Sequence, residues 1–311
     1  MRTLWLVTAM AIGLAACAST QFDIPAISPP GKGEALPGKI VWHDLISDTP
    51  QQTREFYGEL FGWEFDDLAI VGANYALIRH RGRVIGGLVD QNRLPATADI
   101  SQWVVALSVA DAERAASTVE DAGGTVFTPP TSLGDRGIIS VVADPQGAVL
   151  ALLQTDGEDP ADRSTRVGDG EFLWNEMWSS DADASVAFYQ KLASFQMEEL
   201  TAQGVSAPVD YHVLSSQGSP RMGIRQRPAD DVPPVWISYL RVADEAALRD
   251  KVSRVPALGG EVLVPVTQRP GGGFLAVIAG PSGAGIALQT WPEQGKPRRV
   301  SQLTVQQGGE S

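Results

Sequence analysis

The sequence predicts an α+β protein made of two tandem modules, each built from two βαβββ units. The first observation is an internal repeat, because a strand–helix opening at residues 41–63 returns at residues 173–192. Four bulky residues match at one constant spacing of 132 positions: Trp42, Phe56, Tyr57 and Leu60 against Trp174, Phe188, Tyr189 and Leu192. The second observation is size, since 311 residues with 43% hydrophobic content suit two domains of roughly 150 residues.

The first module covers residues 38–154. Thr49 and Pro50 are typical of a helix start, and Gly123-Gly124 is typical of a helix end. The expected order is strand 41–47, helix 50–61, hairpin 75–78 with 84–88, strand 103–109, helix 111–122, and strands 126–127, 138–142 and 149–154.

The second module, residues 171–292, repeats this order. Residues 155–170 between the modules are charged, contain Gly and Pro, and lack an apolar stripe, which predicts a linker. Residues 293–311 are polar and are predicted to be a disordered tail.

The first 16 residues are typical of a signal peptide. Arg2 is followed by an apolar run, residues 4–14, that is shorter than the roughly 20 residues needed to span a bilayer. Leu14-Ala15-Ala16-Cys17 resembles the lipobox of bacterial lipoproteins, which implies that Cys17, the only cysteine, becomes the lipidated first residue. Ala18 resembles the sorting signal for the outer membrane, which implies an envelope location on its periplasmic face. The alternative is an ordinary secretory signal with an incidental cysteine.

Residues 17–37 begin with the lipidated cysteine and are rich in Pro and Gly, and we expect them to form a flexible tether. The formal net charge of −13 argues against a nucleic-acid partner, because affinity for a phosphate backbone comes from clustered Lys and Arg.

Trp42-His43-Asp44-Leu45, the segment 56–63 and the turn Asp144-Pro145-Gln146-Gly147 resemble the vicinal oxygen chelate superfamily. This superfamily includes glyoxalase I, bleomycin-resistance proteins and extradiol dioxygenases. The resemblance covers residues 38–292 and implies that each pair of βαβββ units forms an open curved sheet around a cavity.

In the metal-dependent members, the resemblance implies ligands on the first and last strands of each module. The matching first-strand residues are His43 and Asn175, and the matching last-strand residues are Ala151 and Ala287. Alanine has no donor atom and an asparagine amide is a poor ligand, so only His43 is retained. We therefore expect no metal cofactor, with a divalent metal at an atypical site as the alternative.

Strand alternation suggests which side chains line the cavity. It would place His43 and Asn175 on the cavity face and turn Asp44 and Glu176 to the opposite face. Trp42 and Trp174 are expected in the core, whereas Trp103 and Trp236 fit either core or cavity wall. The expected ligand-binding residues are His43, Leu45, Ser47, Trp103, Asn175, Met177, Trp236 and Tyr239. His80 is expected to be a solvated residue at a hairpin tip.

Three functions fit this sequence. The preferred one is a lipid-anchored, metal-free protein that binds a small organic molecule, as bleomycin-resistance relatives do. The second is a metal-dependent lyase or dioxygenase, and the third is a structural or interaction protein of the envelope. We expect the modules to pair within one chain, because the linker is about fifteen residues long.

Overall fold

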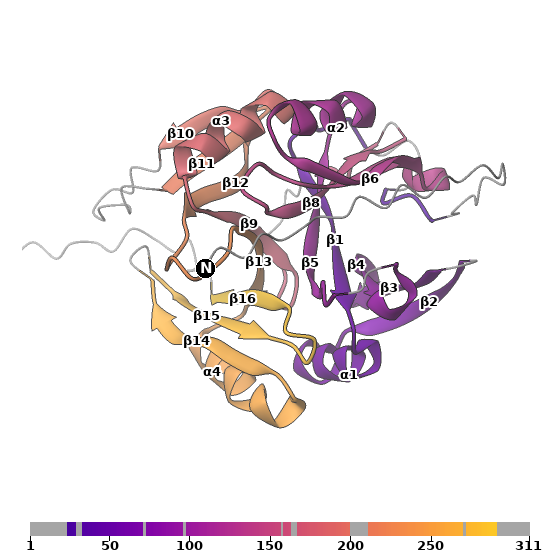
Figure 1. Cartoon of the computed structure of the whole chain (residues 1–311). Helices are drawn as coiled ribbons and strands as arrows, with labels where there is room; N and C mark the ends of the chain where they lie inside the picture. Colours follow the sequence, from indigo (N-terminus) through magenta and orange to yellow (C-terminus); the bar gives the residue numbers. More distant parts are fainter. Residues whose placement is uncertain are drawn as a thin grey trace, which may run out of the picture.

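The chain forms two curved sheets that lie next to each other, one per module, in a computed structural model (Figure 1). The structure describes residues 24–28, 33–70, 73–95, 98–156, 158–162, 167–199, 211–269 and 272–290. The predicted signal peptide, Cys17 and the C-terminal tail lie outside these residues.

The first module contains eight strands in the order β2-β3-β4-β1-β5-β8-β7-β6. Strands β1 and β5, the first of each βαβββ unit, pair antiparallel at the centre and join the two units into one sheet. The elements are β1 (Ile40–Ser47), α1 (Pro50–Phe61), β2 (Glu64–Ile70), β3 (Ala73–His80), β4 (Arg83–Asp90), η1 (Gln91–Arg93), β5 (Gln102–Ser108), α2 (Ala112–Asp121), β6 (Thr125–Ser132), η2 (Gly134–Arg136), β7 (Ile138–Ala143) and β8 (Val149–Gln154).

The second module repeats this topology in the order β10-β11-β12-β9-β13-β16-β15-β14. Its elements are β9 (Phe172–Ser179), α3 (Ala182–Leu192), β10 (Gln196–Glu199), β11 (Tyr211–Ser216), β12 (Ser219–Gln226), β13 (Val235–Val242), α4 (Glu245–Arg254), η3 (Pro256–Leu258), β14 (Glu261–Gln268), β15 (Phe274–Ala279) and β16 (Gly285–Thr290). The α+β fold class and the tandem βαβββ units are confirmed.

Local sequence explains the helix boundaries. Pro50 occupies the first turn of α1, where its missing N–H costs no hydrogen bond, and Gly62 ends the helix in a left-handed conformation (φ 69°). Asp111 caps α2 by accepting a hydrogen bond from the Arg114 N–H, and Asp181 caps α3 in the same way through Ala184. Thr49 makes no such side-chain bond.

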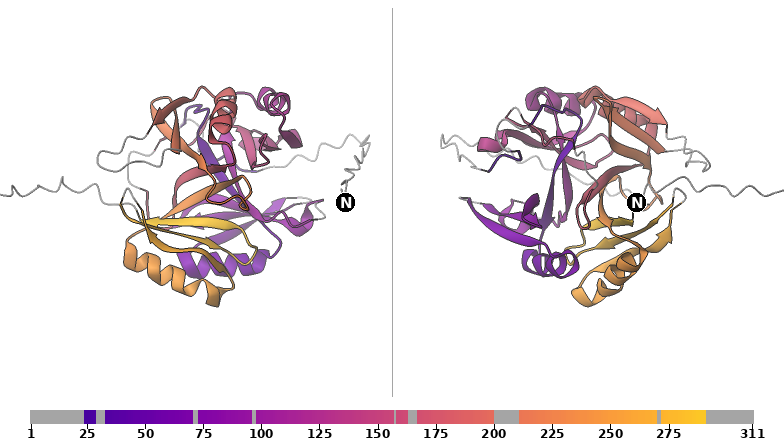
Figure 2. Two further views of the ribbon diagram at one scale, coloured as in Figure 1. Left: turned by 60° about the vertical axis from the view of Figure 1, so that its left-hand side comes forward. Right: turned by 180° about the vertical axis from the view of Figure 1, so that it is seen from behind.

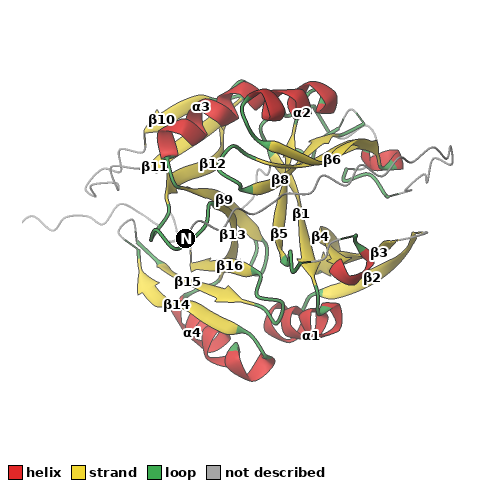
Figure 3. Cartoon of the chain, in the orientation of Figure 1, coloured by secondary structure: helices red, strands yellow, loops and turns green. Residues whose placement is uncertain are grey.

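Helices cover the outer faces of the sheets in two pairs, α2 beside α3 and α1 beside α4 (Figure 3). Each pair combines one helix from each module, and the hydrophobic core beneath it is shared. One core packs Val105, Leu150 and Leu152 of the first module against Phe188 and Tyr189 of α3. The other packs α1 against β13–β16 and α4. The two modules are therefore bound together by two interlocked cores.

The opposite face of each sheet carries a smaller cluster of its own. We call it the inner face, and both views of Figure 2 show the two sheets as separate curved layers. The inner face of the first module carries Trp42, Tyr75, Leu77, Val104 and Leu153. That of the second carries Trp174, Trp178, Tyr239, Val277 and Ala287.

The described residues of the expected tether and of the expected linker are packed against the rest of the protein. Ile24 and Ser28 are buried, and Leu36 donates its N–H to Asp159 Oδ2 at 2.6 Å. Asp159 belongs to the predicted linker and is itself fully buried, accepting a hydrogen bond from Ser108. The described part of the expected tether is therefore held against the first module and the linker, and Pro37 also accepts a hydrogen bond from Ser216 of the second module. Among the described residues, no helix is both long and apolar enough to cross a membrane.

Candidate functional site

Strand β1 presents His43, Leu45 and Ser47 toward the helices and the other module. Of these three expected ligand-binding residues, His43 lines the cavity between the modules that is described below, whereas Leu45 and Ser47 are not part of its lining. Leu45 belongs to the core under α1, and Ser47 Oγ lies 2.8 Å from Thr53 Oγ1 of that helix. The inner face instead receives Trp42 and Asp44. Both sides of β1 are buried by apolar groups, so alternation alone could not identify the face.

His43 meets its counterpart Asn175 at the boundary between the modules. His43 Nε2 lies 2.9 Å from Asn175 Oδ1, which also accepts a hydrogen bond of 2.9 Å from Ser238 Oγ. The imidazole stacks on the Phe172 ring with centroids 3.6 Å apart. Of the predicted residues, the structure brings these first-strand positions of the two modules into direct contact.

Burial controls the protonation of His43. Desolvation lowers its pKa from 6.5 to about 4, against the opposing effect of the hydrogen bond with Asn175. The ring is therefore neutral at pH 7. Because the Asn175 oxygen accepts, Nε2 carries the proton and Nδ1 is an acceptor.

The inner face of the first module holds a polar cluster around Asp44. Tyr75 donates to Asp44 Oδ1 at 2.7 Å, and Trp42 Nε1 donates to the same oxygen at 2.9 Å. Arg136, 4% exposed, lies 4.1 Å from the centre of the Trp42 ring and donates to Tyr75 Oη at 3.0 Å. Burial raises the pKa of Asp44, whereas Arg136 and the two hydrogen bonds oppose that rise.

The second module repeats the cluster with Glu176 in place of Asp44. Tyr211 donates to Glu176 Oε1 at 3.0 Å, and Trp174 Nε1 donates to Tyr211 Oη at 2.8 Å. Tyr239 and Trp178 add donors to Oε2 at 2.5 and 3.2 Å. Burial, with the nearby Glu176 carboxylate, raises the pKa of Tyr239 far above its usual range. Asp44 and Glu176 thus lie on the strand faces opposite those of His43 and Asn175.

A glycine makes room for each cluster. Gly87 pairs with Asp44 across the parallel strands β1 and β4, and a Cβ there would overlap both Tyr75 Oη and Asp44 Oδ1. Gly223 pairs with Glu176, and a Cβ there would overlap Tyr211 Oη. The same three-residue relationship, acid, tyrosine and glycine, is therefore built twice.

The remaining predicted residues divide between core and inner face. Trp103 and Trp236 are 2% exposed and lie in the shared cores, donating to Tyr57 Oη and Tyr189 Oη at 3.1 Å each. Met177 is fully buried in the same core as Trp236. Tyr239 alone of these lies on an inner face.

His80 is buried rather than solvated, because the chain that enters the second module folds over the β3–β4 hairpin. His80 Nε2 donates to the Asp169 carbonyl oxygen at 2.9 Å. The sequence around a hairpin tip does not reveal such a long-range cover.

A cavity of about 510 Å³ lies where the first strands of both modules meet. Such a volume is typical of sites for small organic molecules. Its aromatic and polar lining includes Trp42, His43, Phe172, Trp174 and Asn175. These residues come from equivalent positions on β1 and β9, so the duplication itself creates the cavity.

Two cations and one carboxylate line the same cavity. Lys39 and Arg221 form ion pairs with Asp162 at 2.9 and 2.6 Å. Burial opposes ionisation of Asp162, but hydrogen bonds from Arg221 and Lys39 outweigh it and lower its pKa to about 2. With His43 neutral, the described charged lining carries one net positive charge.

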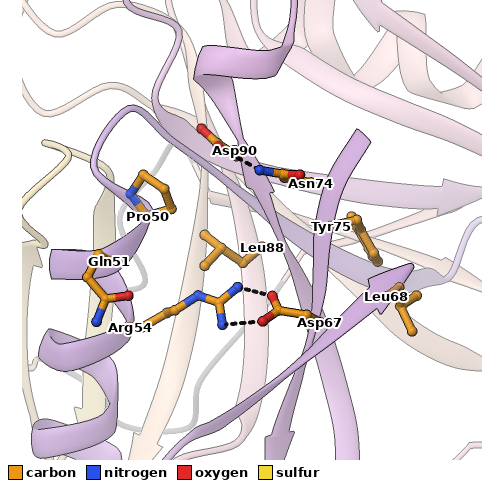
Figure 4. A pocket seen from close by; sticks show the side chains of 9 residues that line it. All are labelled: Pro50, Gln51, Arg54, Asp67, Leu68, Asn74, Tyr75, Leu88 and Asp90. Carbon is orange, nitrogen blue, oxygen red and sulfur yellow. Dashed lines mark hydrogen bonds and ion pairs between the residues drawn. The ribbon is translucent and has the colours of Figure 1, made fainter. Parts of the chain in front are cut away.

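A second cavity of about 420 Å³ lies between α1 and strands β2–β4 (Figure 4). Arg54 reaches across it to form an ion pair with Asp67, and Asn74 donates to Asp90 at 3.2 Å. Its lining is largely charged or amide, so it offers less apolar surface to an organic ligand than the cavity between the modules.

The described residues do not fit a metal centre of the kind the resemblance implies. Ala151 and Ala287 lie on the inner faces without donor atoms, and Asp44 faces the Arg136 guanidinium, which already supplies positive charge. Within the described ranges, no three His, Cys, Asp or Glu side chains are grouped to hold a metal ion.

Residues 39–152 match the family model of the Glyoxalase/Bleomycin resistance protein/Dioxygenase superfamily. The match covers the first module, and the second module has the same topology.

Similar curated proteins include ones from Mycobacterium and Streptomyces. The chain is 28% identical to "Putative glyoxylase CFP32" of Mycobacterium tuberculosis over 269 residues, which cover 85% of this chain and all of that protein. It is also 28% identical to "Anthracycline biosynthesis protein DauV" of a Streptomyces species, over 81% of this chain and 93% of that protein.

Solved structures show the same fold at low identity. The Mn(II)-bound glyoxalase of Novosphingobium aromaticivorans gives a TM-score of 0.56 at 15% identity, covering 82% of each chain. The 2,2',3-trihydroxybiphenyl 1,2-dioxygenase of Sphingomonas wittichii gives 0.53 at 15% identity, covering 82% of this chain and 91% of that one.

Sequence reasoning missed the acid–tyrosine clusters. A signal was present, because Trp42 and Asp44 repeat as Trp174 and Glu176, and Tyr75 repeats as Tyr211. A comparison of every residue of β1 with its equivalent in the second module would have identified the pair of acids, Asp44 and Glu176.

Proposed function

We propose that the chain is a metal-free binding protein for a small organic molecule that has an aromatic or apolar body and an acidic group. The cavity of about 510 Å³ between the modules carries this proposal. Trp174 and Phe172 would contact the body of the ligand, and His43 Nδ1 could accept a hydrogen bond. Lys39 and Arg221 would attract the acidic group.

Binding is favoured over catalysis by the protonation of His43. A histidine with a pKa near 4 is a weak base, far from the pKa near neutrality that general base catalysis requires. Its other nitrogen is already used by Asn175. These features suit a fixed hydrogen-bonding partner.

A thermal-shift screen tests this proposal. The probes are aromatic carboxylic acids, each compared with its neutral amide, and a binder present at 100 times its dissociation constant stabilises the folded state by about 2.7 kcal/mol. We expect acids, but not amides, to raise the melting temperature. Arg221→Gln should weaken this response at least tenfold, whereas Arg249→Gln, on the exposed face of α4, should leave it unchanged. No response to any acid would refute the proposal.

A metal-dependent lyase or dioxygenase is the second candidate. It is favoured by the relative named "Putative glyoxylase", which this chain matches over that protein's full length. Such an enzyme would need an atypical ligand set, and metal analysis separates it from the binding protein.

We also propose that Cys17 is lipidated and holds the protein in the cell envelope. The proposal is supported by Leu14-Ala15-Ala16-Cys17 after an apolar run. Metabolic labelling with a fatty acid should mark the wild-type protein in membrane fractions. Cys17→Ser should abolish the label, and a labelled Cys17→Ser protein would overturn the assignment.

A further inference from the structure

Residues Ile24–Ser28 lie on the inner face of the first module. Ile24 belongs to the same cluster as Trp42, Tyr75 and Val104, and Ile27 packs against this cluster. The Ile24 N–H donates to the Leu133 carbonyl oxygen at 3.2 Å. Pro25 and Ala26 between them are exposed, so the segment packs its two isoleucines on the sheet and bonds to Leu133, which directly follows β6.

Arg136 anchors the segment from the other side. Its Nε donates to the Pro25 carbonyl oxygen at 3.1 Å, while Nη1 donates to Tyr75. Arg136 is buried, and a buried guanidinium is costly unless its donors are satisfied. If the segment left, Nε would lose this acceptor, and another carbonyl or carboxylate could take its place.

The two modules differ in this respect. Among the described residues, the inner-face cluster of the second module consists only of its own strands β9 and β13–β16. The cluster of the first module includes Ile24 from outside the βαβββ units. The duplicated sheets therefore share their acid–tyrosine clusters but not this cover.

We propose that Ile24–Ser28 is a built-in peptide ligand of the first module, covering a binding surface for an extended apolar peptide. Ile24 and Ile27 fill the apolar positions, and the Pro25 carbonyl marks the acceptor position at Arg136. Because the segment is tethered, its effective concentration is in the millimolar range, so an external peptide competes poorly unless the segment is released. This surface adjoins the cavity between the modules, because Ile27 and Trp42 belong to both.

The segment would also shorten the link to the membrane. If Cys17 is lipidated, seven residues lead from it to Ile24, which span at most about 25 Å. Docking of Ile24–Ser28 would then hold the inner face of the first module close to the bilayer.

A labelled peptide with the sequence of residues 22–30 tests the proposal on the full-length protein. In the variant Ile24→Ser/Ile27→Ser the internal segment is weakened while the surface of the module is unchanged. We expect this variant to bind the peptide at least tenfold more tightly than wild type. If the first variant folds poorly, a second one with residues 24–28 replaced by Gly and Ser can be used. It should show the same gain in affinity for the peptide.

Two controls make the result specific. Arg136→Gln, added to the segment variant, should remove the gain, because the acceptor position loses its donor. Phe127→Ser, an exposed residue 59% accessible on β6, should leave peptide binding at the wild-type level. Equal binding by wild type and segment variants, or a gain that survives Arg136→Gln, would overturn the proposal.

Discussion

His43 and Asn175 occupy equivalent positions in the two modules, and their side chains meet, with Nε2 and Oδ1 2.9 Å apart. The residues are 132 positions apart in the chain, so this bond links the first module directly to the second. One is ionisable and the other is not, which gives the boundary a dependence on pH.

We expect the boundary to weaken in acid. The pKa of His43 is about 4 when folded and about 6.5 when unfolded. Between these values the unfolded chain binds a proton that the folded chain does not, so stability falls as pH falls through this window. The loss attributable to His43 is about 3 kcal/mol.

Chemical denaturation of wild type and His43→Asn between pH 7 and 4 measures this effect. Asp44 has a raised pKa and acts in the opposite direction, but it is present in both proteins, so the difference curve isolates His43. A difference that does not change with pH would contradict the assignment.

Gly87→Ala should destabilise the first module by about 1–3 kcal/mol, as overpacking does. The new Cβ would overlap Tyr75 Oη and Asp44 Oδ1. In a Tyr75→Ala background the phenol ring is gone, so we expect the added cost of Gly87→Ala to shrink. Urea unfolding of the four proteins in this cycle provides the measurement.

Gly58→Ala is the matched control. A Cβ at Gly58 in α1 has its nearest neighbour, the Trp63 carbonyl oxygen, at 3.4 Å. Because alanine favours a helix over glycine, stability should stay level or rise by up to about 1 kcal/mol. Equal losses at Gly58 and Gly87 would argue against a specific steric role for Gly87.

Tyr189→Phe should cost more than Tyr57→Phe. Tyr189 Oη donates to the buried Asp144 carboxylate of the first module at 2.9 Å, and burial raises the pKa of Asp144. A hydrogen bond to a charged group contributes about 1.5–3 kcal/mol, against roughly 1 kcal/mol for a neutral one. Tyr57 is the equivalent residue of the first module, and its hydroxyl accepts a hydrogen bond from Trp103 Nε1. It lies beside Gly280, which has no side chain that could accept a hydrogen bond. Thermal unfolding of both variants checks the ranking.

Purified protein should contain no stoichiometric Mn, Zn, Ni or Fe, and a chelator should leave its melting temperature unchanged. The reason is the chemistry of the inner faces, where Ala151 and Ala287 offer no ligand and Arg136 faces Asp44. Elemental analysis of the purified protein gives the answer. A metal bound one-to-one and removed by chelator would favour the enzyme candidate.

The repeat of aromatic residues, the turn and cap residues and the period-two strands together predicted the fold class and both βαβββ modules. These signals are local, because glycine, proline and aspartate act on the backbone within a few residues. The last strand of the first module ends at Gln154, and the first strand of the second module begins at Phe172.

The sequence by itself thus determined the duplication and the order of elements, and it drew attention to the first strand. Only the tertiary structure decided which face of β1 packs toward the helices and the second module and which lies on the inner face. It also decided that His43 contacts Asn175. The physical reason is that β1 is buried on both sides, so its apolar residues do not alternate with polar ones. Contacts between residues more than 100 positions apart, such as His43 with Asn175 or Arg136 with Pro25, depend on how the modules and the N-terminal segment pack.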